Sequence, residues 1–416
     1  DERQVRIGLQ TGENNRFLRF WWEVSINKFC PSFESNSKPT PEGIKWFPYN
    51  KGGQFKKWIG GQDFVVNWSD NGREIIEYQE YLNSIKPANS RMGIANSSEL
   101  YFKESISWSK VTSGGISFRL FTTGYIFDVA GPSFFPFSNI KYYLGLLNSK
   151  VIPSIVAALS PTLNYEAGSI RAIPVIINKV GAIEENVEEI LKINIRDENT
   201  WDFQSFPLLF NASESTPTLE TSYKAWISQN QATIADTQRL EEENNRLFIY
   251  AYGLQDELTP EVPIEQITLT VNPAYRYGVK GTEQERNTRF RSDTMTELVS
   301  YTIGCMMGRY SLDQDGLVYA HAGNEGFDAS LYKTFPADSD GIVTIMDDEW
   351  YKDDACNRVV EFVKTVWGEE NLTENLQFIA DSLCLNAIIP RKSETAVETI
   401  RRYLSTKFYK DHMQTY

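Results

Sequence analysis

The segment 223–253 constrains the fold most, because it has the pattern of one long uninterrupted helix. Its apolar stripe consists of Trp226, Thr233, Leu240, Leu247 and Leu254, which recur every seven residues, together with Ile227, Ile234 and Phe248. Such spacing predicts a rod of roughly 45 Å with one apolar face. A threonine in the stripe and the lack of a second matching segment favour packing on the helix's own chain over an intermolecular coiled coil. The helix divides the 416 residues into an earlier and a later part.

The earlier part has the patterns of an α/β domain. Apolar residues alternate with polar ones over 100–129, where two glycine-containing turns separate the runs. The expected elements are strands within 100–129, an amphipathic helix over 70–85, a helix over 142–159 and a strand over Ile170–Ile177. Pro174 makes the last of these an edge strand rather than a central one.

The later part is mainly helical by the same criteria. The expected helices are 283–310, 355–367, 373–385 and 394–409. Arg286, Arg289 and Arg291 begin the first of them and fit a solvated polar turn better than a phosphate site, since the surroundings are acidic.

The two parts differ in charge. The whole chain has a net charge of −14, which by itself argues against a nucleic-acid-binding protein. Residues 1–180 carry 20 basic and 15 acidic residues, a net charge of +5, whereas residues 181–416 carry 21 and 40, a net charge of −19. Such asymmetry is expected when one part faces phosphate. A solvated acidic surface also explains the negative charge of residues 181–416. It does not explain why residues 1–180 lack an acidic excess.

Composition favours a cytoplasmic protein. Four scattered cysteines without a CxxC motif indicate neither a zinc ribbon nor a disulfide framework. We expect no membrane segment and no signal peptide, because no apolar run is long enough and the chain opens with charged residues. Its first residue is not Met, which indicates a fragment or a processed chain.

Two segments carry groups suited to nucleic acid. Residues 45–68 interleave lysines with aromatic rings, a combination that suits phosphate contact and base stacking, although a hairpin with water-facing lysines remains an equal alternative. Gly8–Phe17 contains glycines that let the backbone approach a ligand closely, although a simple hairpin turn has the same composition.

Several sequence words resemble known families. The "LLNSK" of 146–150 and the G-x-I-x-x-I-P of 168–174 resemble the end of the target-recognition domain in DNA methyltransferases and restriction specificity subunits. The G-x-x-T-G-x-N-x-x-F of 8–17 is similar to the segment that follows the catalytic domain in many adenine methyltransferases. KGGQFKKWIGGQDFVVNW (51–68), GRYSLD (308–313) and IRRYLSTKFYKDHMQTY (400–416) resemble the PglX-like adenine-specific DNA methyltransferases of BREX phage-defence systems.

The resemblance implies an architecture. It implies an α/β fold with an α+β target-recognition domain containing a mixed sheet over 1–215, a long spacer helix over 216–255 and a mainly helical C-terminal domain over 256–416. The implied partners are double-stranded DNA and other phage-defence proteins, with no membrane. An alternative is a protein-interaction scaffold that docks partner subunits of the defence complex.

The residues of methyl transfer are not expected in this chain. An adenine methyltransferase needs a glycine-rich loop for S-adenosylmethionine and an Asn/Asp-Pro-Pro-Tyr/Phe motif, whereas Asn272-Pro273 is followed here by Ala274. S-adenosylmethionine is therefore expected for the full-length protein and no cofactor for this chain. Asp353, Asp354, Glu361 and Lys364 resemble a nuclease cluster only crudely, Asp313–Gly316 fits a turn better than a calcium loop that has Asn324 at its last position, and neither His321 nor His412 has a nucleophile nearby.

The candidate site residues are therefore groups that bind DNA. They are Thr11, Asn14, Arg16, Lys56, Lys57, Arg91, Lys103, Lys110 and Arg119. Most are cations for phosphate. Asn14 and Arg119 are also candidates for reading adenine and guanine.

A first prediction concerns the cofactor. Because the cofactor loop and the Pro-Pro motif are missing, this chain should neither bind S-adenosylmethionine nor methylate DNA. Titration calorimetry measures the binding directly, and a dissociation constant in the micromolar range would contradict the prediction.

Overall fold

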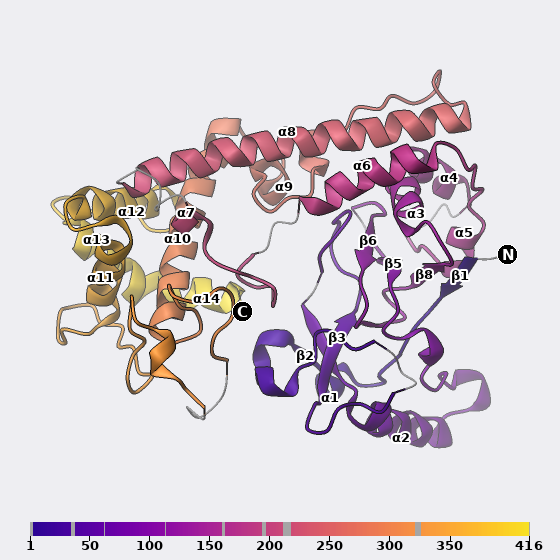
Figure 1. Ribbon diagram of the computed structural model, residues 1–416, viewed down its shortest axis with the longest axis horizontal. Coiled ribbons are helices and arrows are strands. Elements are labelled where there is room, and N and C mark those ends of the chain that lie inside the picture. Colours follow the sequence, from indigo (N-terminus) through magenta and orange to yellow (C-terminus); the bar gives the residue numbers. More distant parts are fainter. Residues whose placement is uncertain are drawn as a thin grey trace. The chain divides into compact units, whose positions relative to one another are not determined.

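The structure is a computed structural model that describes residues 3–415 apart from 35–37, 62, 113, 160–162, 194–196, 211–217 and 321–325 (Figure 1). The chain packs as two compact units. Unit 1 consists of Asp1–Asn194 and Ala235–Thr268, and unit 2 consists of Ile195–Ile234 and Leu269–Tyr416. Helix α8 (Leu219–Tyr252) contributes residues to both units. The expected domain boundary at residue 215 lies outside the described residues, and the division into three domains stays a prediction.

The first sheet of unit 1 is antiparallel. Its strands run in the order β1 (Arg3–Arg6), β8 (Ser133–Pro136), β5 (Ser105–Trp108) and β6 (Phe118–Phe121). Ile106 lies opposite Leu120 on one side and opposite Phe134 on the other. Ser107 lies opposite Arg119, so the arginine projects from the same face of the sheet as this serine.

The second sheet of unit 1 is mixed. Its order is β2 (Leu18–Phe20), β4 (Phe64–Asn67), β3 (Trp46–Asn50) and β7 (Ile126–Phe127). β3 pairs with β4 in antiparallel and with β7 in parallel orientation. The segment 51–63 is therefore the connection between two neighbouring strands. The mixed sheet and the helices around it confirm the expected α/β fold class.

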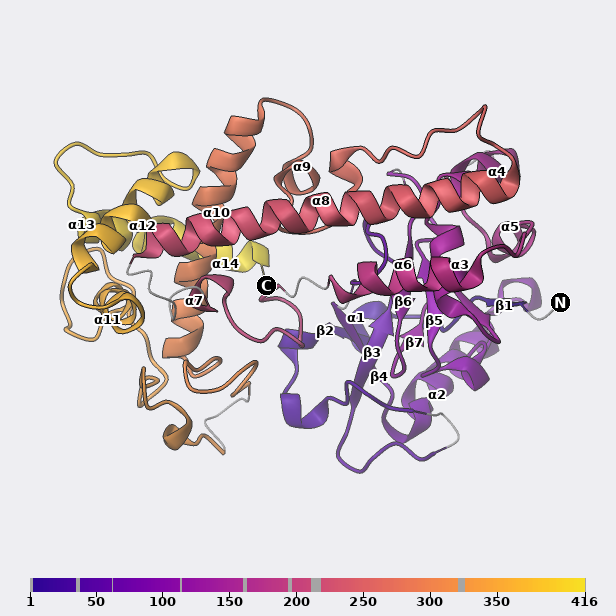
Figure 2. The ribbon, with the colours of Figure 1, turned by 45° about the horizontal axis from the view of Figure 1, so that its top comes forward.

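The helices of unit 1 pack in two apolar cores, the first two with the strands of the second sheet and the other four with those of the first. They are α1 (Asn14–Phe17), α2 (Ser69–Ile85), α3 (Ile140–Leu147), α4 (Val151–Leu159), α5 (Ala167–Arg171) and α6 (Val180–Lys192), with 3-10 turns at Trp21–Glu23, Ile26–Lys28, Ala88–Ser90, Ser98–Leu100 and Ile264–Gln266. Figure 2 shows α3 beside α6. Gly145 permits this close approach, because a Cβ there would lie 2.9 Å from Val187 and 2.8 Å from Asn244 of α8.

Two expectations for unit 1 are corrected by the structure. The segment 170–177 is not an edge strand, because Ala167–Arg171 is helical and Ile170 and Ile173 enter the core. The helix α6 was not expected, although Ile183, Val187 and Ile190 have helical spacing and are all buried. The proline argument for an edge strand failed because the tertiary core, rather than a neighbouring strand, buries the β-branched residues.

Unit 2 is mainly helical, as expected. Its elements are α7 (Pro207–Phe210), α9 (Pro273–Tyr277), α10 (Glu283–Met306), a 3-10 turn at Ala329–Leu331, α11 (Ala355–Trp367), α12 (Leu372–Asn386), α13 (Ala396–Tyr403), a π-helical turn at Leu404–Phe408 and α14 (Tyr409–Thr415). Their apolar faces form a core of their own that includes Trp226 of α8. The four predicted helices of this part are confirmed as α10, α11, α12 and the run from α13 to α14.

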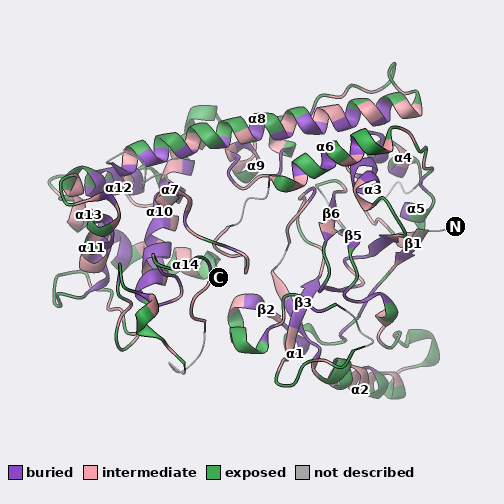
Figure 3. Ribbon diagram, viewed as in Figure 1, coloured by how far each residue is buried: buried purple, intermediate pink, exposed green. Residues whose placement is uncertain are grey.

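The long helix α8 confirms the prediction for 223–253 and adds a polar feature to it. Ile234, Leu240 and Phe248 are buried as the stripe requires. Figure 3 shows buried stretches recurring along α8. Glu241, Asn244 and Asn245 are buried beside them. Buried polar groups need hydrogen-bond partners, so the face of α8 in unit 1 must meet specific acceptors and donors.

No single helix in the described residues is long and apolar enough to cross a bilayer. Of the described helices, only α3 and α4 taken together reach the necessary length and apolar composition, and they are bent by 73° relative to each other.

The burial of Leu240 yields a stability prediction. Leu240→Asp should lower the free energy of unfolding by more than about 2 kcal/mol, because it places an unpaired charge in the core of unit 1. Ala235→Asp is the control, since Ala235 is exposed on the same helix. Urea unfolding measures both. An unchanged midpoint for Leu240→Asp with a changed oligomeric state would indicate an intermolecular helix instead.

Candidate nucleic-acid interface

The positive charge of unit 1 is concentrated in one segment. Residues 16–61 carry eight basic and three acidic residues, a net charge of +5, whereas the rest of 1–180 carries 12 of each. The structure places this segment on β2, β3, the 3-10 turns between them and the connection that follows β3. The whole excess of residues 1–180 therefore comes from one sheet and its adjoining loop.

The connection 51–61 folds over the side chain of Arg119. Its Gly-Gly pairs, 52–53 and 60–61, all have positive φ values, which only glycine adopts without strain. A Cβ at Gly61 would lie 2.2 Å from Nη1 of Arg119, and one at Gly53 would lie 3.3 Å from the same atom. Arg119 is 1% exposed. The glycines of the KGGQFKKWIGG motif thus permit the loop to close over a buried arginine.

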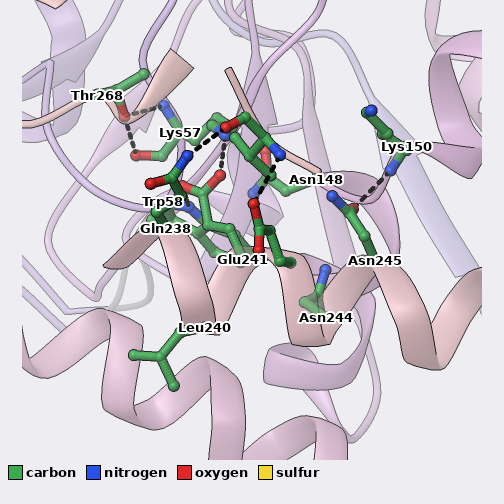
Figure 4. A network of polar contacts seen from close by, with 12 residues as sticks. Lys57, Trp58, Asn148, Lys150, Gln238, Leu240, Glu241, Asn244, Asn245 and Thr268 are labelled. Atoms are coloured by element: carbon green, nitrogen blue, oxygen red, sulfur yellow. Dashed lines mark hydrogen bonds and ion pairs between the residues drawn. The ribbon is translucent and has the colours of Figure 1, made fainter. Parts of the chain in front are cut away.

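Glu241 of α8 holds the end of this loop (Figure 4). Its carboxylate forms a buried ion pair with Nζ of Lys57 and accepts a hydrogen bond of 2.7 Å from the indole N–H of Trp58. The backbone N–H of Lys57 donates to Oγ1 of Thr268 at 3.1 Å. Trp58 also joins the loop to β6, since its N–H donates to the carbonyl of Phe118 at 2.9 Å. One carboxylate therefore satisfies both side chains that end the loop.

The buried amides of α8 continue this attachment. Asn244 donates to the carbonyl of Gly145 at 2.9 Å. Asn245 accepts from the backbone N–H of Lys150 at 2.9 Å (Figure 4). The side chain of Asn148 bonds both backbone groups of Phe118, at 3.0 and 2.9 Å. These contacts explain the break between α3 and α4. At this break the polar groups of the LLNSK motif form hydrogen bonds with α8 and β6. The expectation of one helix over 142–159 missed this break.

Three of the nine expected DNA-binding residues are buried, which the sequence did not indicate. Lys57 is 8% exposed and paired with Glu241, and Arg119 is enclosed by the glycine loop. Thr11 is also buried, and its hydroxyl donates to Oδ1 of Asn14 at 2.8 Å. Asn14 itself is exposed at the start of α1. Of the two candidate base readers, only Asn14 thus faces solvent.

The other expected cations lie nearer the surface and differ in their partners. Arg16 pairs with Glu74 at 2.9 Å, and this hydrogen bond lowers the pKa of the Glu74 carboxyl. Lys110 pairs with Glu166 at 3.1 Å. Within the described parts of the chain, Lys56, Arg91 and Lys103 form no ion pair. Neutralised cations contribute less to phosphate binding, so the last three are the stronger candidates.

A buried carboxyl lies beside the loop. Burial raises the pKa of Asp63, and the charges of Lys56 and Arg119 oppose that rise. Asp63 therefore balances part of the charge of Lys56 and Arg119 close to β4.

The candidate catalytic groups are structural. Oδ1 of Asp354 accepts from the N–H of Asn357 at 2.8 Å, and its carboxylate pairs with the buried Arg401. Asp313 accepts from the N–H groups of Lys333 and Thr334, which agrees with a turn. His321 and Asn324 lie outside the described residues. Among the residues that the structure does describe, no three His, Cys, Asp or Glu side chains are placed to hold a metal ion.

Comparison with known proteins gives two relatives. The chain is 42% identical, over 98% of its length, to the adenine-specific methyltransferase BrxX of Escherichia coli O9:H4 (strain HS). It is 35% identical, over 99% of its length, to the adenine-specific methyltransferase PglX of Lacticaseibacillus casei (strain Zhang). No protein-family model matches the chain.

The similarity covers nearly all of this chain but only part of each relative. The chain spans about a third of their length, 33% and 32% respectively. These identities confirm the resemblance to adenine-specific methyltransferases that the motifs of 8–17, 51–68, 308–313 and 400–416 indicated.

The Glu241 contacts yield a second stability prediction. Glu241→Ala should lower the free energy of unfolding by about 3–5 kcal/mol, because it leaves the Lys57 ammonium buried without a counter-charge. Glu243→Ala is the control and should cost less than about 1 kcal/mol, since Glu243 pairs with Arg246 on the exposed side of the same helix.

A double-mutant cycle measured by urea unfolding isolates the pair. Glu241→Leu combined with Lys57→Met should destabilise less than the two single changes added together, because neither charge then remains alone. Additive losses would show that the two side chains do not depend on each other.

Proposed function

We propose that this chain, homologous to a third of two adenine-specific methyltransferases, is the part of such an enzyme that recognises its DNA target. It would bind duplex DNA in a sequence-specific manner. The similarity over nearly the whole chain carries the proposal. The concentration of unit 1's positive excess in residues 16–61 supports it, since phosphate contacts supply much of the affinity for DNA.

Transfer of a methyl group to adenine sets requirements that this chain meets only in part. The target amine is buried in the base stack of duplex DNA, so such enzymes extrude the base into a pocket. In our proposal this chain grips the duplex, and a catalytic region elsewhere in the longer protein receives the adenine and S-adenosylmethionine. In this proposal the chain supplies no cofactor site and does not act as an enzyme by itself.

Sequence reading requires side chains that reach base edges in a groove. Asn14 supports such a role best, because it is exposed at the start of α1 and asparagine forms paired hydrogen bonds with adenine. Arg119 is enclosed by the loop and is better placed to shape it. We therefore retain Asn14 as a base reader and assign Arg119 to the architecture of the loop.

The proposal extends to partners and place of action. The longer protein would work in the cytoplasm with other proteins of a phage-defence system. The acidic residues 181–416, with a net charge of −19, favour protein partners over DNA for unit 2. A scaffold that docks such partners is the second candidate function, and it leaves unit 1 with weak DNA binding.

Salt dependence separates the two functions. If unit 1 contacts several phosphates, the logarithm of the binding constant for a short duplex should fall linearly with the logarithm of salt concentration, by about 0.9 for each contact. Nitrocellulose filter binding over a range of salt concentrations measures this slope. A flat dependence with weak binding would leave the scaffold as the function.

A further inference from the structure

Three cations gather at the start of β3. None of the nine expected DNA-binding residues lies at this place. The N–H of Lys45 donates to the carbonyl of Lys28 at 3.0 Å, so these two residues are backbone neighbours. The ring of Trp46 is 5.3 Å from Nζ of Lys45 and 5.8 Å from Cζ of Arg19. Lys28 and Lys45 are exposed and Arg19 is half-buried. The ring of Trp46 thus contacts two cations and helps to orient them.

These cations are not paired directly with acidic side chains, although Lys45 lies near enough to Glu74 to help lower the pKa of that carboxyl. Within the described residues, Arg19, Lys28 and Lys45 form no ion pair with any carboxylate. Three other basic residues of 16–61 do, since Arg16 pairs with Glu74, Lys38 with Glu34 and Lys57 with Glu241. Like charges held close together repel one another, so an anionic ligand would stabilise the group.

A second group lies just beyond the other end of β3. Lys51 follows the strand and its Nζ is 5.2 Å from the ring centroid of Phe64, and Lys56 is half-buried in the loop. In the described part of the protein these two lysines also lack an ion pair. Lys51 lies six positions after Lys45, which at about 3.3 Å per residue places them roughly 20 Å apart.

That separation suits a duplex. The major groove of DNA is about 12 Å wide, so groups roughly 20 Å apart can contact the phosphates on both sides of it. A site for one small anion would need the five cations at one point. Here they lie at the two ends of one strand. Lys56 follows Lys51 by five positions in the same loop, and its neighbour Lys57 is fixed by Glu241.

We infer that the phosphate-binding surface of this chain consists of Arg19, Lys28 and Lys45 at one end of β3 and of Lys51 and Lys56 at the other, and that each end contacts one strand of the duplex. The inference rests on the proposed DNA-binding function and identifies its surface. Lys57, Lys110 and Arg119 support the fold around this surface and do not contact phosphate.

The test compares three double variants of the full chain on one duplex at several salt concentrations. Lys28→Glu with Lys45→Glu, and Lys51→Glu with Lys56→Glu, should each flatten the salt slope by about two units and weaken binding roughly 10- to 100-fold at 0.1 M salt. Lys141→Glu with Lys192→Glu is the control. It changes the net charge equally, but in lysines of unit 1 that pair with Glu188 and Glu189.

The outcomes separate the inference from the function. Combining the two interface variants should add their losses on duplex DNA, because the ends contact different strands. If both interface variants bind like the control while the wild type keeps a steep slope, the surface is wrong and the function stands. If the wild type itself shows no slope, the function fails. Lys→Gln versions of the same pairs, checked by thermal unfolding, exclude loss of folding as the cause.

Discussion

The buried contact of Glu241 with Lys57 and Trp58 is the interaction on which the rest of unit 1 depends. Through it the helix α8 fixes the end of a glycine-rich loop, and that loop encloses Arg119 and carries Lys51 and Lys56. A charge pair with so little exposure costs desolvation energy, which good geometry and the added indole hydrogen bond offset. The main effect of the pair is therefore to hold the loop in one position, rather than to add stability to the protein. A loop held in one position presents its cations to a ligand without a further ordering cost.

The sequence predicted the elements whose patterns are local. Seven-residue spacing located α8 and alternation located β5 and β6, because these periods follow from backbone geometry. The burial of Lys57 could not be predicted, since Lys56 and Lys57 are chemically identical and only Glu241 of α8, 184 residues after Lys57, distinguishes them. The prediction of an edge strand over 170–177 was wrong for a similar reason, because burial of Ile170 and Ile173 depends on tertiary neighbours. The cluster at Lys45 was missed because Lys28 and Arg19 reach it from separate turns and strands.

Whether a charged side chain is available to a ligand depends on its ion-pair partners in the fold. A count over 1–180 locates a surplus of five positive charges, and the structure assigns it to one mixed sheet and its loop. Ion pairing then removes Arg16, Lys38 and Lys57 from consideration and leaves a smaller set at the two ends of β3. The homology gives this surface a context, since both relatives are adenine-specific methyltransferases about three times as long as this chain. Binding and chemistry would then lie in different parts of one polypeptide.

Amide hydrogen exchange with and without a duplex tests the central claim most directly, because it reports contact without any substitution. The account predicts that DNA slows exchange in residues 16–34 and 44–61 and leaves α10 to α13 unchanged. Protection confined to unit 2, or none in either unit at a DNA concentration that saturates binding, would contradict the assignment of this chain's DNA surface to β3 and its loop.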